Sequence, residues 1–73
     1  MKQKYMVLDY IREFGSITPL DGFRDLGITR LSAVVFKLRE EGHDIEKVIE
    51  TGKNRFGNRT RYARYSFGKG EKQ

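Results

Sequence analysis

The sequence predicts a single α+β domain in which three helices are followed by a two-stranded β-hairpin. Three observations favour this fold class. Apolar residues recur at helical spacing in the N-terminal half, capping residues and glycines divide that half into three segments, and the C-terminal third alternates polar and apolar side chains around a turn. We expect the domain to cover residues 1–67. Residues 68–73 have nothing to bury and are expected to form a disordered tail.

Size and composition restrict the classes of protein. A chain of 73 residues is close to the lower size at which one core can hold a fold without disulfides or metal. The absence of cysteine excludes a disulfide scaffold, thiolate zinc ligation and thiol catalysis. No run approaches the ~18 apolar residues of a membrane helix, and no apolar signal-peptide block follows the N-terminus, so we expect a cytoplasmic protein without a membrane partner.

The first helix is predicted over residues 3–14 and is followed by Gly15, which ends the pattern. Its inner face is expected to consist of Val7, Leu8, Ile11 and Phe14. Ile17, in the link that follows, should pair with a later strand or fill the core. The outer side of this helix, around Tyr5 and Tyr10, is the surface on which a homodimer would form.

The second helix has a strong start signal. Thr18 is expected to cap it, Pro19 suits its first position, and the Asp21 carboxylate can reach back to the cap. Gly27 is well placed for the left-handed residue that ends it. Its inner face is expected to consist of Leu20, Phe23 and Leu26.

The third helix is predicted from Arg30 to about Glu41, with Thr29 as its N-cap and Gly42 after its end. Together with the second helix it forms a helix-turn-helix, and Ile28 should pack into the angle. The inward side chains are expected to be Leu31, Val35 and Leu38, with Val34 beside them. The outer face carries Arg30, Ala33 and Lys37 and suits a DNA major groove, although an ordinary solvated face is the alternative.

The C-terminal third predicts the hairpin. Its first strand is expected over Glu46 to Thr51 with an irregularity or bulge, because Val48 and Ile49 interrupt strict alternation. Its turn is expected around Gly57-Asn58. In the second strand one face should hold Ala63, Tyr65 and Phe67, with Tyr65 and Phe67 closing the core.

The net charge of +5 is concentrated in this hairpin and just beyond it. No acid occurs between Thr51 and Phe67, and the six basic residues of this part leave the rest of the chain at −1. Such a cluster favours a polyanionic partner, most often nucleic acid. Phe56 at the turn gains little unless it contacts a partner or folds back on the hairpin as a structural plug. A merely solubilising basic hairpin is the alternative. The basic residues are Lys53, Arg55, Arg59, Arg61, Arg64 and Lys69.

Three helices with a central helix-turn-helix and a terminal hairpin form the winged-helix arrangement. The sequence resembles the small helix-turn-helix proteins of bacteriophages and prophages over about residues 5–67. The matching segments are Gly15 to Leu20, Leu26 to Leu31, Lys53 to Gly57 and Arg64 to Phe67. The resemblance implies DNA binding through the third helix and the wing. Similar family members often have a basic residue where this chain has Val34, which would leave Arg30 and Lys37 as the main groove-facing charges.

The predicted function is therefore binding of double-stranded DNA by a transcriptional or other DNA-transaction regulator. The third helix is expected in the major groove and the basic wing on the backbone or in the minor groove, which Arg55 and Arg59 beside the turn could reach. The predicted contact residues are Thr29, Arg30, Ser32, Ala33, Val34, Lys37, Lys53, Asn54, Arg55, Phe56, Asn58, Arg59, Arg61 and Arg64.

Other function classes are less well supported. A protein-interaction module that binds and redirects a host protein is the alternative, and RNA binding has weaker support because no spaced aromatic platform is present. His43 is the sole histidine and Gly52-Lys53 lacks the upstream glycine of a P-loop, so we expect neither an enzyme nor a cofactor or metal. A homodimer on a two-fold site stays open.

Overall fold

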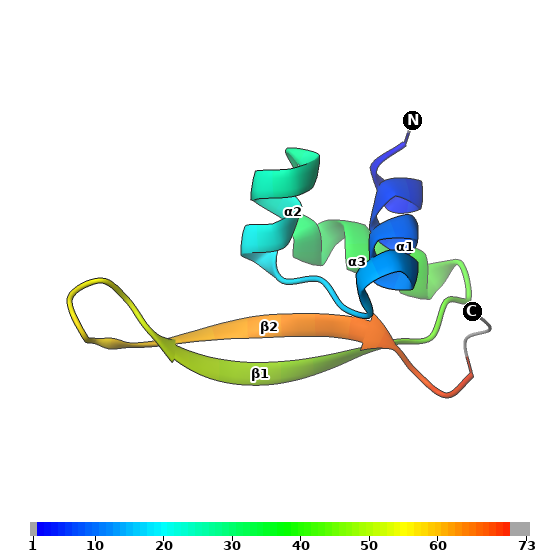
Figure 1. Cartoon of the computed structure of the whole chain (residues 1–73). Helices are drawn as coiled ribbons and strands as arrows, with labels where there is room; N and C mark the ends of the chain where they lie inside the picture. The colour runs from blue at the N-terminus through cyan, green and yellow to red at the C-terminus, as the bar shows by residue number, and fades with distance from the viewer. Residues whose placement is uncertain (1, 71–73) are drawn as a thin grey trace.

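Residues 2–70 are described by the structure, which is a computed structural model. They form three helices followed by an antiparallel pair of strands, which confirms the predicted fold class. The three helices lie together on one side of the hairpin, and the hairpin tip projects well beyond them (Figure 1). The elements are α1 (Gln3–Phe14), α2 (Pro19–Leu26), α3 (Leu31–Glu40), β1 (Ile45–Lys53) and β2 (Arg59–Phe67).

One small core joins the helices to the base of the hairpin. It contains the predicted inward residues of α3 and the predicted angle residue Ile28, and Phe67 packs against it from β2. The distal half of the hairpin contributes no buried side chain, so it extends away from the core. The buried apolar residues are Val7, Leu8, Ile11, Ile17, Ile28, Leu31, Val35, Leu38, Ile45 and Tyr65.

The prediction that Phe14 belongs to the core is wrong. Val7, Leu8 and Ile11 are buried, but Phe14 is 67% exposed. It lies in the last turn of α1, directly before Gly15 adopts the left-handed φ of 89° that ends the helix. The Phe14 ring instead packs beside the Tyr10 ring, with 4.6 Å between the ring centroids. The helical pattern continues to Phe14, but the core ends one turn earlier.

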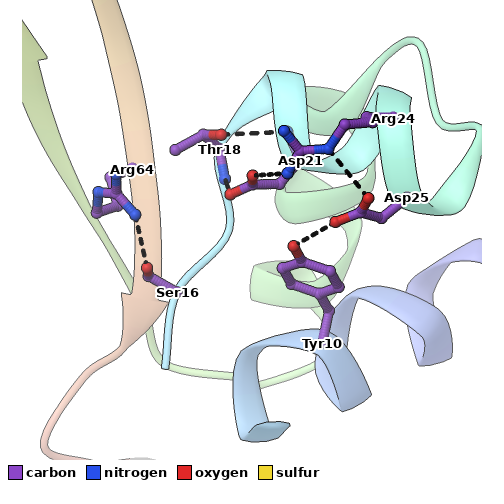
Figure 2. Close-up of polar contacts among 7 residues, drawn as sticks. All are labelled: Tyr10, Ser16, Thr18, Asp21, Arg24, Asp25 and Arg64. Atoms are coloured by element: carbon purple, nitrogen blue, oxygen red, sulfur yellow. Dashed lines mark hydrogen bonds and ion pairs between the residues drawn. The ribbon is translucent and has the colours of Figure 1, made fainter. Parts of the chain in front are cut away.

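The start and end of α2 are as predicted. The Thr18 hydroxyl accepts a hydrogen bond from the Asp21 amide at 3.2 Å, and the Asp21 carboxylate accepts one from the Thr18 amide at 3.1 Å (Figure 2). Gly27 has a φ of 70°, and its N–H donates to the carbonyl of Phe23. This reciprocal cap fixes where a short helix begins.

The predicted inner face of α2 is wrong for two of its three residues. Leu20 and Phe23 are both more than 60% exposed, whereas Leu26 packs against the core as expected. The buried residue of α2 is Gly22, which lies beside Leu31 of α3. A methyl group at position 22 would lie 3.7 Å from Leu31 Cδ1, so this position of α2 faces α3. The larger apolar residues are left on the outside.

The predicted N-cap of α3 is also wrong. Arg30, not Thr29, occupies the cap position, and no side chain forms a capping hydrogen bond there. The Arg30 carbonyl accepts from the amides of Ala33 and Val34 at 3.2 and 3.4 Å, so the helix starts one residue later than the Ser/Thr preference indicates. Thr29 is exposed in the bend before it.

The hairpin register is continuous, and the predicted bulge in the first strand is wrong. Every residue of β1 pairs with one residue of β2, from Ile45 opposite Phe67 to Lys53 opposite Arg59. Val48 and Ile49 are both exposed, so their succession does not require a backbone irregularity. Ile17 both pairs with a strand and fills the core. It is fully buried, and its N–H and carbonyl exchange hydrogen bonds with Tyr65 at 2.8 Å.

The chain after β2 is described as far as residue 70. The amides of Gly68 and Gly70 donate to the carbonyl and the carboxylate of Asp44, at 2.8 and 2.9 Å. The remainder of the predicted disordered tail, residues 71–73, lies outside the described residues.

Candidate nucleic-acid interface

The outward face of α3 is apolar and basic in its first two turns. Arg30, Ala33 and Lys37 are exposed, as is Ser32 on one flank, whereas Val34 is half-buried and packs against the core. A shallow hollow of about 330 Å³ runs along this face towards the start of α1. Its lining residues are Gln3, Arg30, Ala33, Val34 and Lys37.

Phe36 is a candidate contact residue that the sequence reasoning missed. It is 62% exposed on α3. At 100° per residue, Phe36 falls roughly 130° from the centre of the buried line of Leu31, Val35 and Leu38, and this spacing could have identified it from the sequence. An exposed aromatic ring beside Ala33 gives the helix an apolar surface of the kind that contacts thymine methyl groups.

The acidic end of α3 is partly neutralised by α1. Lys4 Nζ lies 2.8 Å from the Oε2 of Glu41, and this contact holds the pKa of Glu41 below its usual range and raises the pKa of Lys4. Glu41 therefore stays ionised but paired. The negative charge near the C-terminus of α3 opposes an approaching polyanion less than an unpaired carboxylate would.

The hairpin separates its charged side chains between two faces. Directly opposed residues of an antiparallel pair share a face, and successive residues alternate. Thr51, Lys53, Arg59 and Arg61 therefore lie on the same face as the core residue Tyr65 but beyond the core, and all four are exposed. The opposite face carries Glu50, Tyr62 and Arg64. The distal part of the core-side face is thus a stripe of three cations without an acid.

The hairpin tip is a five-residue loop, Asn54 to Asn58, wider than the predicted turn at Gly57-Asn58. The Asn54 side-chain oxygen accepts from the amides of Phe56 and Asn58 at 2.9 and 3.0 Å, and the Asn54 amide donates to the Asn58 carbonyl at 2.9 Å. Gly57 has a φ of 82°, which favours glycine. Phe56 is 82% exposed and does not fold back on the hairpin.

Some basic side chains have partners within the described residues and others have none. Arg12 and Arg24 form ion pairs with Asp9 and with Asp21 and Asp25, and Arg39 donates to the Ile45 carbonyl. The basic side chains of the outer α3 face and the distal wing have no ion pair and no side-chain hydrogen bond with any residue between 2 and 70. These are Arg30, Lys37, Lys53, Arg55, Arg59 and Arg61.

Arg64 differs from the other predicted contact residues of the wing. Its Nε donates to the Glu50 Oε1 at 2.7 Å and its Nη1 donates to the Ser16 hydroxyl at 2.9 Å. The guanidinium lowers the pKa of the Glu50 carboxyl. The structure thus gives Arg64 internal partners and separates it from the cationic stripe.

A cleft of about 680 Å³ separates the start of α2 from the wing. It runs between the α2 N-terminus, where Leu20 is exposed, and the strand face that carries Tyr62. The lining residues are Thr18, Pro19, Leu20, Asp21, Gly52, Lys53, Thr60, Tyr62 and Arg64.

The described residues contain neither a metal-binding cluster nor a membrane-spanning helix. Between residues 2 and 70, no three His, Cys, Asp or Glu side chains gather in a way that could hold a metal ion. The helices in the same range are too short or too polar to cross a lipid bilayer.

A helix-turn-helix whose third helix presents an outer apolar and basic face, followed by a basic two-stranded wing, defines the winged helix-turn-helix class. The chain belongs to the winged helix-turn-helix domain family, whose model matches residues 2–70. No curated protein and no solved structure matches the chain. Domains of this class generally bind DNA and are typically non-catalytic.

Proposed function

We propose that this protein binds duplex DNA with the outer face of α3 in the major groove and the distal wing on the neighbouring phosphates. The observation that carries the proposal is the distribution of unpartnered cations. Six basic side chains of the α3 face and the distal wing have no partner within residues 2–70, as is also true of Lys2, Lys47 and Lys69, whereas Arg12, Arg24 and Arg64 are paired with acids. Unpaired cations on one elongated surface suit a phosphate backbone.

The two parts of this surface have different roles in the proposal. Arg30, Ala33, Phe36 and Lys37 provide hydrogen-bond donors and apolar contacts for base edges in the major groove. Lys53, Arg59 and Arg61 neutralise phosphates and position the helix without reading the sequence. Thr29, Ser32, Asn54 and Asn58 are exposed beside these groups and are proposed to contact the backbone.

The salt dependence of binding tests the proposal. If the protein neutralises five or six phosphates, the logarithm of the association constant should fall with the logarithm of salt concentration at a slope of roughly −4 to −5. Fluorescence anisotropy of a labelled duplex measures this slope. Binding that is insensitive to salt, or absent at low salt, would contradict the proposal.

Charge variants give the test a matched control. Arg59→Gln and Arg61→Gln should each reduce the magnitude of the salt slope by about 1, because each removes one phosphate contact. Arg12→Gln removes the same charge from α1, where Arg12 already pairs with Asp9 at 3.3 Å. Equal effects of Arg12→Gln and Arg61→Gln would show that net charge alone, and no defined surface, is responsible.

The finer role that we propose is that of a regulator of transcription or another DNA transaction, of the type found in phages and prophages. The resemblance of Lys53 to Gly57 and of Arg64 to Phe67 to such proteins supports this role. Selection of bound duplexes from a random library would identify a target. Recovery of no enriched sequence would contradict a sequence-specific regulator. Light scattering would measure whether the protein is a monomer or a homodimer.

A host-protein partner is the second candidate, and one observation favours it. Phe14 and Tyr10 line a hollow of about 300 Å³ between α1 and α2, together with Met6, Leu26 and the acids Asp9 and Glu13. NMR separates the two candidates on addition of duplex DNA. Amide shifts confined to α3 and the wing support DNA binding, and unchanged spectra favour the protein partner.

A further inference from the structure

We propose that the wing tip inserts the Phe56 ring into the DNA minor groove, where it acts as an apolar wedge between neighbouring base pairs. The inference rests on the proposed DNA binding and adds a kinked duplex as the preferred ligand. It depends on three observations: the presentation of the ring, the charges around it, and the reach of the hairpin.

The tip holds the Phe56 ring out in solvent. Among residues 2–70, Phe56 is the most exposed of the large apolar residues, at 82%. Two hydrogen bonds within the loop hold the backbone around Phe56. The Phe56 amide donates to the Asn54 side-chain oxygen at 2.9 Å, and the Gly57 amide donates to the Asn54 carbonyl at 3.0 Å. The loop therefore uses its polar groups for its own closure. An ordered backbone that points a ring outward loses less conformational entropy on insertion than a mobile loop would.

Three basic residues lie close to Phe56 in the loop and at the ends of the two strands. Arg55 precedes it, and Lys53 and Arg59 face each other across the last pair of the ladder. All three are exposed. An apolar tip with basic neighbours suits a groove that has phosphates at its rim and base steps between which an apolar side chain can insert, as the DNA minor groove does. Base stacking on an aromatic side chain is favourable for every base.

The hairpin is long enough for this contact. Tyr65 is the residue of β2 that pairs with Ile17 of the helical domain. Arg59, at the tip end of the same strand, lies six residues earlier in the chain. Six residues of strand span roughly 20 Å. Half of one DNA turn is about 17 Å, so the tip can reach the minor groove next to the major groove that holds α3. Figure 1 shows the tip standing clear of all three helices, so nothing obstructs it.

The wedge has a consequence for sequence preference. Inserting a side chain between base pairs unstacks them and kinks the duplex by about 20–90°. Pyrimidine–purine steps such as TA and CA kink more easily than A-tracts. The protein should therefore favour duplexes that place such a step under the tip, at a position that α3 does not touch.

Two single-tryptophan variants test the insertion directly. Because the sequence contains no tryptophan, each variant has one indole whose emission reports its own position. In F56W, addition of a duplex of roughly 25 base pairs with TA and CA steps should quench the indole emission and protect it from acrylamide. F14W is the matched control, because Phe14 is 67% exposed but lies beside Asp9 and Glu13 on α1. Its emission should not change. Anisotropy of the labelled duplex, recorded in the same samples, reports whether the complex forms.

Three results have distinct meanings. Quenching in the F56W variant alone supports insertion. If the complex forms while the F56W indole stays unquenched and accessible to acrylamide, or if both variants are quenched equally, the wedge is overturned and the proposed DNA binding is left intact. No complex at low salt overturns the proposed function and the wedge with it.

DNA bending provides the second measurement. Energy transfer between dyes at the two duplex ends should rise when the unmodified protein binds. It should not rise when the duplex is saturated with the F56A variant. The rise should also be smaller on an A-tract duplex than on a TA-containing duplex of equal length. If F56A bends the duplex as the unmodified protein does, Phe56 is not a wedge.

Discussion

Arg64 on the wing donates a hydrogen bond from its Nη1 to the hydroxyl of Ser16, 2.9 Å away in the link between α1 and α2 (Figure 2). The two residues are far apart in the sequence, and the same guanidinium also holds Glu50 of β1 at 2.7 Å. One side chain thus ties both strands of the wing to the helical domain. Together with the Ile17–Tyr65 bridge, this contact joins the wing to the link between α1 and α2.

Ser16→Ala should weaken DNA binding without removing a charge. The lost hydrogen bond to a half-exposed guanidinium is expected to cost about 1 kcal/mol or less in unfolding free energy. The wing becomes less well oriented, so the association constant should fall while the salt slope stays the same. Titration of a labelled duplex at several salt concentrations measures both quantities.

Arg64→Gln is the comparison for this prediction. If Arg64 acts only through wing orientation, its variant also keeps the salt slope. A slope smaller in magnitude by about 1, as expected for Arg61→Gln, would instead make Arg64 a phosphate contact.

Two glycines of the helix-turn-helix should respond oppositely to alanine. Gly22 lies inside α2, and a methyl group there would meet Leu31 at an ordinary contact distance of 3.7 Å. Gly22→Ala should therefore stabilise the fold by about 0.5–1 kcal/mol through helix propensity and chain entropy. Thermal unfolding followed by circular dichroism would then show a midpoint higher by about 2–8 °C for a domain of this size.

Gly27→Ala should destabilise the fold. No atom lies within 4 Å of a methyl group at this position, so the penalty comes from the φ of 70° alone. The left-handed conformation costs a residue with a side chain roughly 1–2 kcal/mol. The pair would contradict this account if both variants changed the unfolding midpoint in the same direction.

Phe36→Ala should relax sequence preference and leave stability almost unchanged. The ring is 62% exposed on α3, so its removal should change the unfolding free energy by no more than about 0.5 kcal/mol. On a duplex selected from a random library, replacing the contacted thymine by deoxyuridine should weaken the unmodified protein and have no effect on the variant.

Phe23→Ala is the control for Phe36→Ala, because Phe23 is 61% exposed on α2. The Phe23 variant should keep the response to deoxyuridine. The prediction for Phe36 is wrong in either of two cases. Replacing each thymine by deoxyuridine leaves the affinity of the unmodified protein unchanged, or the Phe36 variant loses as much affinity as the unmodified protein.

Stability should fall in acid. Lys4 lowers the pKa of Glu41, Arg64 lowers that of Glu50, and Arg24, followed by Tyr10, lowers that of Asp25. The ordinary pKa values of these groups are 4.5, 4.5 and 3.8. Because the folded pKa lies below the unfolded one, each contribution is present above the unfolded value and is lost as the pH falls through the folded value.

The unfolding midpoint should therefore change little between about pH 7 and pH 5 and decrease below the ordinary carboxyl values. The double variant Glu41→Gln and Glu50→Gln should show a shallower decrease, although a modest one, since these side chains are exposed. If the unfolding midpoint falls equally steeply with pH in the variant and the unmodified protein, other carboxylates cause the loss of stability in acid.

Local patterns predicted the elements and most of the core. The cap at Thr18 and the glycines at positions 15 and 27 act within a few residues of the backbone, and they mark the helix ends correctly. The inward line of Leu31, Val35 and Leu38 follows from helix geometry alone and is also correct. The same geometry applied to α2 failed, because apolar size indicated Leu20 and Phe23 although Gly22 is the buried residue that faces α3.

The sequence by itself determined three helices, a basic hairpin and the excess of charge at its distal end, since these depend on spacing and composition. Only the tertiary structure decided which cations lack partners. Arg61 and Arg64 belong to the same basic run, but the alternation of β2 places them on opposite faces, and only Arg64 comes within reach of Ser16 and Glu50. That separation depends on contacts between residues distant in the chain, which no local pattern contains.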